Sequence, residues 1–306
     1  MSPRQAKILH AGRIFVFAWR MAASRRGSYT ARRMPASFRQ RINIKYFMVA
    51  YLGLLLLLAS ILAGDPGRFL SGAALVALYA LFDVAWTRLR DRVWYLPVSS
   101  WISGLVLANV GPPAPSLWLL ILLPLVAVAG KQLLHLGRSR HIFNPAGFAL
   151  LVLTLFTPVI SWWTASINVW TLTIIGLVGL FILWRQQRFH VAISFIAVYA
   201  LGEIILGLFQ GAGIANIPAV MQSVLLSGSF LFFVTVMLIE PITSGFPTRE
   251  KRIVYGALVG VFSLASLLLA PWLPITDFDP FIAGLLLGNL AASLLYLPKA
   301  ARPAST

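Results

Sequence analysis

The stretch that decides the fold reads SRHIFNPAGF, residues 139–148, and it places an Asn-Pro pair where a basic loop becomes a hydrophobic helix. Proline lacks a backbone N–H and its predecessor avoids the α-helical region, so the chain enters this helix through an irregular turn. Irregular backbone at membrane depth is tolerated only where protein or a polar cavity surrounds it. We therefore predict that the turn at Asn144 and Pro145 lines a site.

The composition of the chain is that of an integral membrane protein. Charged residues make up 11% of the 306 residues and hydrophobic residues 59%, whereas soluble domains carry roughly 25% charged residues. The mean hydropathy is +0.85. The chain has no cysteine, which excludes a disulfide and a cysteine-ligated iron–sulfur cluster of its own. Any such cluster would belong to a partner subunit.

Apolar runs divide the chain into a basic N-terminal tail (1–45), a transmembrane domain (46–298) and a short C-terminal tail (299–306). A membrane-spanning helix needs about 20 mostly apolar residues. We therefore predict an all-α integral membrane protein with ten transmembrane helices. The predicted spans are 46–63, 69–87, 94–110, 116–130, 146–163, 167–184, 190–209, 219–239, 253–271 and 280–297.

The distribution of basic residues tests this division independently. With ten spans, 24 of the 25 Lys and Arg residues fall in the tails and loops of one side, and only Arg68 lies opposite. The positive-inside rule then places both termini in the cytoplasm. The net charge of +17 thus reflects topology rather than nucleic-acid binding. We expect the basic loops to contact anionic lipid.

A short repeat supports the count of ten. Phe143-Asn144-Pro145 opens the fifth predicted span and Phe278-Asp279-Pro280 opens the tenth. Five crossings separate the two strings. Because a repeat unit with an odd number of crossings reverses its orientation in the membrane, we predict a five-plus-five inverted repeat with a pathway at its pseudo-twofold axis. The alternative is that the two short Phe-x-Pro sequences are similar by chance.

A second polar break, at Glu240-Pro241-Ile242-Thr243-Ser244, ends the eighth predicted span on the same side as Asn144. With the first break, it resembles the NqrB/RnfD family, membrane subunits of the sodium-translocating NADH:quinone reductase and of the Rnf ferredoxin:NAD complexes. The family pattern Arg-x-Ile-Phe-Asn-Pro-Ala is similar to residues 140–146. The family pattern Asp-Pro-Val-Thr-Ser, with a later basic residue and Tyr-Gly, is similar to residues 240–244 with Arg252 and 255–256.

The resemblance implies a non-autonomous subunit of an electron-transport complex in a bacterial inner membrane. It implies bound flavin (FMN or riboflavin), redox-coupled ion movement, and other membrane and soluble redox subunits as partners. By the same resemblance, the candidate cofactor-binding residues belong to the two breaks. They are Arg140, Phe143, Asn144, Pro145, Glu240, Pro241, Thr243 and Ser244.

One departure concerns how a flavin would be attached. Family members usually carry FMN on the threonine of a Ser-(Gly/Thr)-Ala-Thr sequence after the Asn-Pro helix. Here that place holds Ser161-Trp162-Trp163-Thr164, in which two tryptophans replace small residues. Thr164 is therefore a weak attachment candidate, and we expect the flavin to be non-covalent. The alternative is an interfacial tryptophan pair beside an ordinary threonine.

Three other ionisable residues stand near or inside predicted spans. Glu203 falls within the seventh span and is predicted to be buried, either as an ion-coupling residue or in an interhelical hydrogen bond to Ser or Thr. Asp83, one turn from Thr87, is predicted to pair with the basic end of its own helix. His141 is interpreted as an anion or headgroup contact.

Two other functional classes stay open. A small-solute channel of urea-transporter-like architecture would use Asn144 and Asp279 to line a pore without a redox centre. A membrane anchor would dock a soluble iron–sulfur flavoprotein through the basic loops and carry no cofactor. Neighbouring genes would distinguish these classes, since genes for redox subunits would imply the family interpretation and a solute-metabolism cluster would imply transport.

Overall fold

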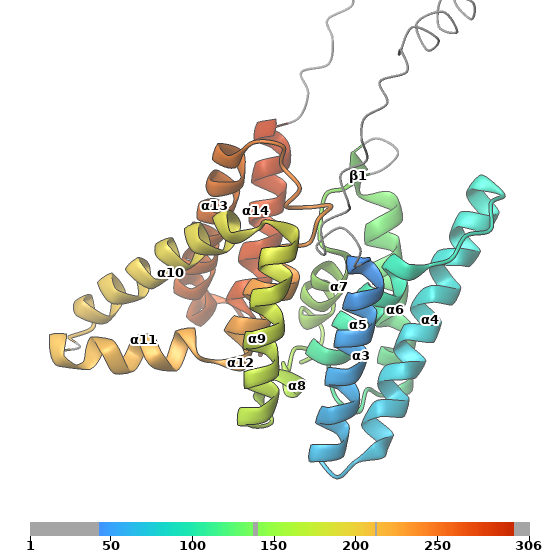
Figure 1. Ribbon diagram of the computed structural model, residues 1–306, viewed down its shortest axis with the longest axis horizontal. Coiled ribbons are helices and arrows are strands. Elements are labelled where there is room, and N and C mark those ends of the chain that lie inside the picture. The colour runs from blue at the N-terminus through green and yellow to red at the C-terminus, as the bar shows by residue number, and fades with distance from the viewer. Residues whose placement is uncertain (1–42, 137–139, 212, 297–306) are drawn as a thin grey trace, which may run out of the picture. The chain divides into compact units, whose positions relative to one another are not determined.

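The computed structural model describes residues 43–136, 140–211 and 213–296, so nearly all of the predicted N-terminal tail and the C-terminal tail lie outside it. The described part is all-α, apart from a two-residue antiparallel pair of β1 (His135–Leu136) with β2 (Arg140–His141). The helices are α3 (Ile44–Leu62), α4 (Pro66–Asp91), α5 (Val98–Val110), α6 (Leu117–Leu133), α7 (Pro145–Thr154), α8 (Trp163–Ser166), α9 (Val169–Gln186), α10 (Phe189–Phe209), α11 (Ile217–Leu225), α12 (Gly228–Phe232), α13 (Arg249–Leu269) and α14 (Pro280–Tyr296), with the short helices η1 (Ile214–Asn216), η2 (Phe233–Met237) and η3 (Ala270–Trp272) (Figure 1).

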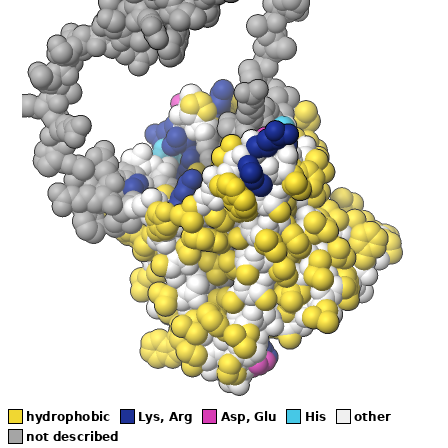
Figure 2. Space-filling model, turned by 90° about the vertical axis from the view of Figure 1, so that its right-hand side faces the viewer, with side chains coloured by type: hydrophobic (Ala, Val, Ile, Leu, Met, Phe, Trp, Pro, Cys, Tyr) yellow, Lys and Arg dark blue, Asp and Glu magenta, His cyan; other side chains and the backbone are white. Residues whose placement is uncertain are grey.

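Several helices identify the chain as an integral membrane protein. Among the described residues, α3, α4, α9, α10 and α13 with η3 are long and apolar enough to cross a membrane. A sixth span results if the bent segment from η1 to η2 is counted as one. Figure 2 shows hydrophobic side chains over most of one face, with Lys and Arg gathered toward one end. This is the surface that a protein embedded in lipid presents.

Each of the ten predicted runs contains a helix, but four of these helices are short. α5 has 13 residues, α6 has 17, α7 has 10 and α14 has 17, against the about 20 that a perpendicular span needs. Within the part of the chain that the structure describes, five to six helices are thus long and apolar enough to span a membrane. Ten crossings stay a prediction.

The fifth predicted span is wrong in its extent. We predicted 146–163, whereas α7 ends at Thr154 and an irregular segment leads to α8. Pro158 explains the early end, since it has no N–H to donate and restricts Thr157 before it. Trp162 follows in a left-handed conformation (φ 49°).

The eighth predicted span is broken rather than continuous. α11 and the α12–η2 segment meet at an angle of 56°. Ser227 begins the second segment, and its hydroxyl accepts a hydrogen bond from the Phe230 N–H at 3.2 Å. A Cβ on Gly228 would lie 1.9 Å from the carbonyl oxygen of Ala165. Glycine at the bend therefore permits close contact with the α8 backbone.

Small residues pack α13 between α10 and α14 (Figure 1). Gly256 lies against the backbone of Val191 on α10, and Gly284 of α14 lies against the backbone of Ser263. Close backbone approach through small residues is the usual way in which helices associate in membranes. These contacts hold α13 closely against both neighbouring helices.

α7 and α14 begin with the same local structure. The Asn144 Oδ1 accepts from the Gly147 N–H at 3.0 Å, the Asp279 Oδ1 accepts from the Ile282 N–H at 2.9 Å, and a proline follows each cap. The two helices also contact each other. The repeated Phe-x-Pro string thus marks a repeated helix start, while its relation by an inverted repeat stays a prediction.

Candidate functional site

The two polar breaks come together in one cavity. Asn144 and Pro145, at the start of α7, share a hollow of about 150 Å³ with Glu240 and Pro241, which follow η2. We call it the inner cavity. Its described lining is Ile44, Lys45, Met48, Ser99, Ile102, Ser103, Val106, Lys131, His141, Asn144, Pro145, Ala146, Gln186, Val236, Glu240, Pro241 and Ile242.

Asn144 has a structural role as well as a place in the cavity wall. Its side-chain oxygen caps α7, and the residue is 5% exposed. Pro145 at the first helical position has no N–H that would need a partner, which suits the start of a helix. Asn144 therefore caps α7 and, with Pro145 and Ala146, lines the inner cavity.

The Glu240 carboxylate links the two breaks directly. Its Oε1 lies 3.2 Å from the His141 Nε2, and its Oε2 accepts from the Thr243 hydroxyl at 3.3 Å. His141 was interpreted from the sequence as an anion or headgroup contact, but it is buried and its contact is Glu240. The Ser244 hydroxyl donates to the Glu240 carbonyl oxygen at 2.7 Å. Thr243 and Ser244 thus shape the Glu240 turn and do not line the cavity.

Two arginines support this turn from behind: Arg188, which the sequence analysis missed, and Arg252, the basic residue of the second family pattern. Arg188 donates from Nη1 to the Ser244 carbonyl at 2.8 Å, and Arg252 donates from Nε to the Phe246 carbonyl at 2.7 Å. Burial, with the nearby Arg252, lowers the pKa of Arg188 to about 10. A buried guanidinium that binds a main-chain carbonyl positions the loop. The sequence feature that could have indicated this role is the position of Arg188 in the short loop between two predicted spans.

A second polar cluster forms around Asp83 of α4, whose carboxylate is fully buried. It accepts hydrogen bonds from Lys131 Nζ (2.5 Å) and Gln132 Nε2 (2.6 Å) of α6, from the Tyr95 hydroxyl (2.5 Å) and from the Ser100 hydroxyl. Asp83 was expected to pair within its own helix, but its charge partner comes from α6. Burial and the neighbouring Asp83 raise the pKa of Tyr95 to about 12, so that this phenol stays a proton donor.

A larger hollow, which we call the vestibule, adjoins the inner cavity. It measures about 810 Å³. Four residues line both spaces, namely Ser99, Lys131, His141 and Ile242. The remaining described residues of the vestibule are Thr87, Arg90, Asp91, Val93, Tyr95, Gln132 and His135. Lys131 and His141 therefore stand where the two spaces meet.

Thr164, the weak attachment candidate, lies away from both spaces. It is fully buried, and its hydroxyl donates to the Asn109 carbonyl at 3.2 Å. The preceding Trp162 donates its indole N–H to Asp279 at 2.6 Å. A threonine held in this way has no hydroxyl exposed for a flavin phosphate.

Glu203 was predicted to be buried, and the structure places it half-buried on α10. Tyr199 lies one turn earlier in the same helix. Phe143 stacks on Phe148 at 5.7 Å between ring centres and does not line the inner cavity. The side chain of Arg140 is outside what the structure describes.

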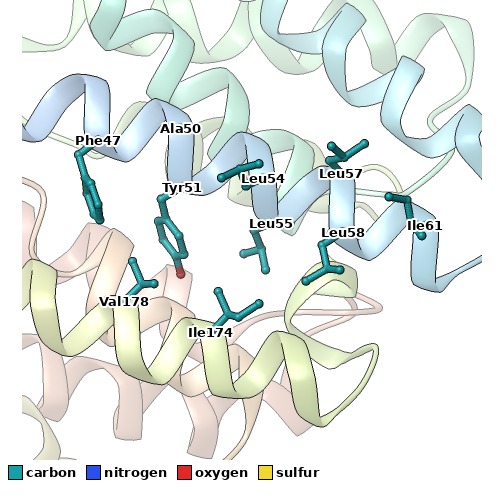
Figure 3. Close-up of a pocket in the computed structure, with 10 residues that line it drawn as sticks. All are labelled: Phe47, Ala50, Tyr51, Leu54, Leu55, Leu57, Leu58, Ile61, Ile174 and Val178. Atoms are coloured by element: carbon teal, nitrogen blue, oxygen red, sulfur yellow. The ribbon is translucent and has the colours of Figure 1, made fainter.

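A third hollow, between α3 and α9, is apolar (Figure 3). It measures about 470 Å³, and Figure 3 shows the Tyr51 ring pointing from α3 toward Ile174 and Val178. Leu54 and Ile61 on its rim are exposed. Such a surface suits the hydrocarbon of the bilayer. The inner cavity, whose lining includes ionisable and amide side chains, is therefore the functional candidate.

No family model matches the chain. Curated relatives from Salmonella paratyphi B and Salmonella newport, each named as a component of an ion-translocating oxidoreductase complex, are 36% identical to it over 84 residues. This stretch is 27% of the chain and 22% of each relative, so the chain matches only about a fifth of their length. The similarity agrees with the resemblance found in the two breaks, and it makes this membrane protein similar to a component of an ion-translocating oxidoreductase complex.

Proposed function

We propose that this chain is the membrane subunit of a complex that couples electron transfer to ion translocation. The observation that carries the proposal is the inner cavity, where two polar turns about a hundred residues apart in sequence are joined by His141 and Glu240. Polar and ionisable groups inside a membrane protein are costly, and they mark ion and substrate sites. The partial similarity to a component of an ion-translocating oxidoreductase supports the same class.

The inner cavity suits the ring of a flavin better than a whole nucleotide. Ligand pockets usually measure about 300–1,000 Å³, so the 150 Å³ of the inner cavity would take only a ring system, and the remainder would lie in the vestibule. The Gln186 Oε1 on the cavity wall is buried without a hydrogen-bond partner among the described residues. A ring N–H would satisfy this acceptor.

We therefore propose FMN or riboflavin bound non-covalently, with Gln186, Asn144 and His141 at its polar edge. A bound flavin supplies electron transfer, and the protein supplies binding and orientation. The burial of Thr164 supports the absence of a covalent link. A visible spectrum of the purified protein should show flavin bands, and a denaturing gel should show no fluorescent band. A colourless protein would contradict flavin binding, and a fluorescent band lost in Thr164→Val would contradict the non-covalent form.

The coupling function is tested in inverted membrane vesicles that contain the chain with its native partners. Reduced methyl viologen serves as the electron donor, and sodium uptake and acidification are followed. We expect Glu240→Gln to abolish donor-driven ion uptake, because it removes the charge between the two turns. Asp65→Asn is the matched control, since Asp65 forms a half-exposed pair with Arg68. Equal activity of the two variants would overturn the role of the cavity.

The pore alternative has less support in the geometry. Asp279, its second proposed lining residue, is bonded to Trp162 and is not among the described residues of the inner cavity. Donor-independent urea efflux from proteoliposomes would favour a channel over a redox subunit. Glu203 stays a proposal for ion coupling, and unchanged coupling in Glu203→Gln would leave it only a structural role.

A further inference from the structure

Asp83 is a fully buried carboxylate within α4, a helix long and apolar enough to span the membrane. An ionised carboxylate in such a place is costly unless a cation compensates it, and removal of the partner from a buried pair is strongly destabilising. The proposed redox chemistry uses neither Asp83 nor its partner Lys131. Their presence therefore calls for a separate explanation.

The ammonium group of Lys131 is surrounded by oxygen atoms as a bound cation would be. Its Nζ lies 2.5 Å from the Asp83 Oδ2, 3.3 Å from the Ser99 Oγ and 3.4 Å from the Ser100 Oγ. One carboxylate and two hydroxyls are hard oxygen donors, the type that alkali and alkaline-earth cations prefer. A lysine at this position acts as a cation tethered to the protein.

We propose that Asp83, Ser99 and Ser100 form a binding site for a small monovalent cation, in which Lys131 is the resident cation and the translocated ion replaces it. The inference rests on the proposed function, because it names the site that the coupling ion uses. A single negative charge matches a single positive one. A divalent ion would leave one charge uncompensated in the membrane.

The position of Lys131 gives the replacing ion a route. The Lys131 side chain is 16% exposed, whereas Asp83 is not exposed at all. Lys131 lines both the vestibule and the inner cavity, so its ammonium has space to turn toward water while Asp83 stays in place. An ion that enters through the vestibule would then reach the carboxylate beside the proposed flavin position.

Two further donors keep the carboxylate in place during the exchange. Tyr95 and Gln132 hydrogen-bond to Asp83 independently of Lys131. They supply no charge, so they orient the carboxylate but do not compensate it. Loss of Lys131 should therefore leave a shaped site that requires a cation.

The test measures thermal unfolding of the purified full-length chain in detergent, in sodium chloride and in choline chloride of equal ionic strength. We expect Lys131→Gln to be stabilised by sodium in a saturable way, since a ligand that binds only the folded state raises the unfolding temperature. The wild type should need more sodium, because Lys131 competes. Asp83→Asn/Lys131→Gln, which removes both charges, should not respond.

An equal unfolding temperature of Lys131→Gln in the two salts would overturn the proposal. If this variant does not fold, the wild-type protein is tested instead. Its Lys131 is labelled with a small amine-reactive reagent, and the labelling rate is measured by mass spectrometry. Sodium should accelerate the labelling of Lys131 several-fold and leave that of Lys251 unchanged. An unaltered rate at Lys131 would equally overturn the proposal.

These measurements need no electron donor, so they separate the cation site from the proposed function. Sodium binding without donor-driven transport would contradict only the redox function. Donor-driven transport without a sodium effect on Lys131→Gln or on Lys131 labelling would contradict only the cation site.

Discussion

The Asn144-Pro145 and Asp279-Pro280 turns share a local structure but have different surroundings. Both begin a helix with a side-chain cap followed by proline. The first turn borders the inner cavity. At the second turn, the Trp162 indole donates a hydrogen bond to Asp279, and Phe281 packs on Phe233 at 5.2 Å between ring centres. The same sequence string therefore makes a site at one place and a packed joint at the other, depending on what the rest of the chain brings to it.

The largest difference between the two turns should appear in activity. Asn144→Ala and Asp279→Ala each remove an N-cap, which costs about 1 kcal/mol of stability. Only the first also removes a polar group from the inner cavity, so we expect it to abolish viologen-driven ion uptake while Asp279→Ala keeps most of it. Vesicle assays at matched expression measure this. Equal losses would mean that the two turns are functionally alike.

Opening the packed turn should have the largest effect on stability. Trp162→Ala removes a buried indole and its bond to Asp279, and we expect a loss of about 3–5 kcal/mol in the free energy of unfolding. Trp162→Phe, which keeps the ring but not the donor, should lose about 1–3 kcal/mol. Denaturant titration in mixed micelles measures both. The exposed Trp170→Ala is the control, and a similar loss there would show that packing at Asp279 is not the cause.

Replacing a glycine by alanine should cost more stability in α14, which follows the packed turn, than in α7, which follows the turn at the inner cavity. A Cβ on Gly284 would lie 2.6 Å from the Ser263 Cα, and we expect Gly284→Ala to cost about 1–3 kcal/mol. The nearest atom to a Cβ on Gly147 would be 3.5 Å away, an ordinary contact. Gly147→Ala should therefore change stability by less than about 1 kcal/mol. The reverse order in thermal unfolding would contradict this packing.

The smallest expected effect is on pH dependence. Burial raises the pKa of the Asp279 carboxyl above its ordinary value. As the pH rises, Asp279 therefore loses its proton at a lower pH in the unfolded chain than in the folded one. Its contribution to stability is complete below the ordinary pKa and declines as the pH rises through the pKa of the folded state. Asp279→Asn keeps a good cap and should lack this decline. Parallel pH profiles of the two proteins would show that Asp279 is not the source.

The sequence predicted the positions of the helices better than their lengths. Apolar runs indicated where helices lie, because a helix that is apolar around its circumference needs only composition to be recognised. Pro158 and the Ser227-Gly228 pair shortened or bent two predicted spans. The sequence contained both breaks, but the length of a span depends on what satisfies the backbone beside it.

The candidate site was predicted in part. Asn144 and Glu240 were singled out because each precedes a proline at the edge of an apolar run, and the structure places both on one cavity. The pairs Asp83–Lys131 and Arg188–Ser244 were missed, since their members are 48 and 56 residues apart. Nothing in the spacing of residues along one helix indicates which neighbouring helix supplies a charge.

The sequence by itself determined that this is a helical membrane protein, where its helices lie, and where its backbone breaks, because hydropathy and proline act locally. Only the tertiary structure decided which break encloses a cavity, which carboxylate receives a cation and which threonine is buried. Burial and charge pairing depend on neighbours distant in sequence. The two turns that begin alike at Asn144 and Asp279 differ for this reason, because Glu240 lines a cavity beside one and Trp162 fills the space beside the other.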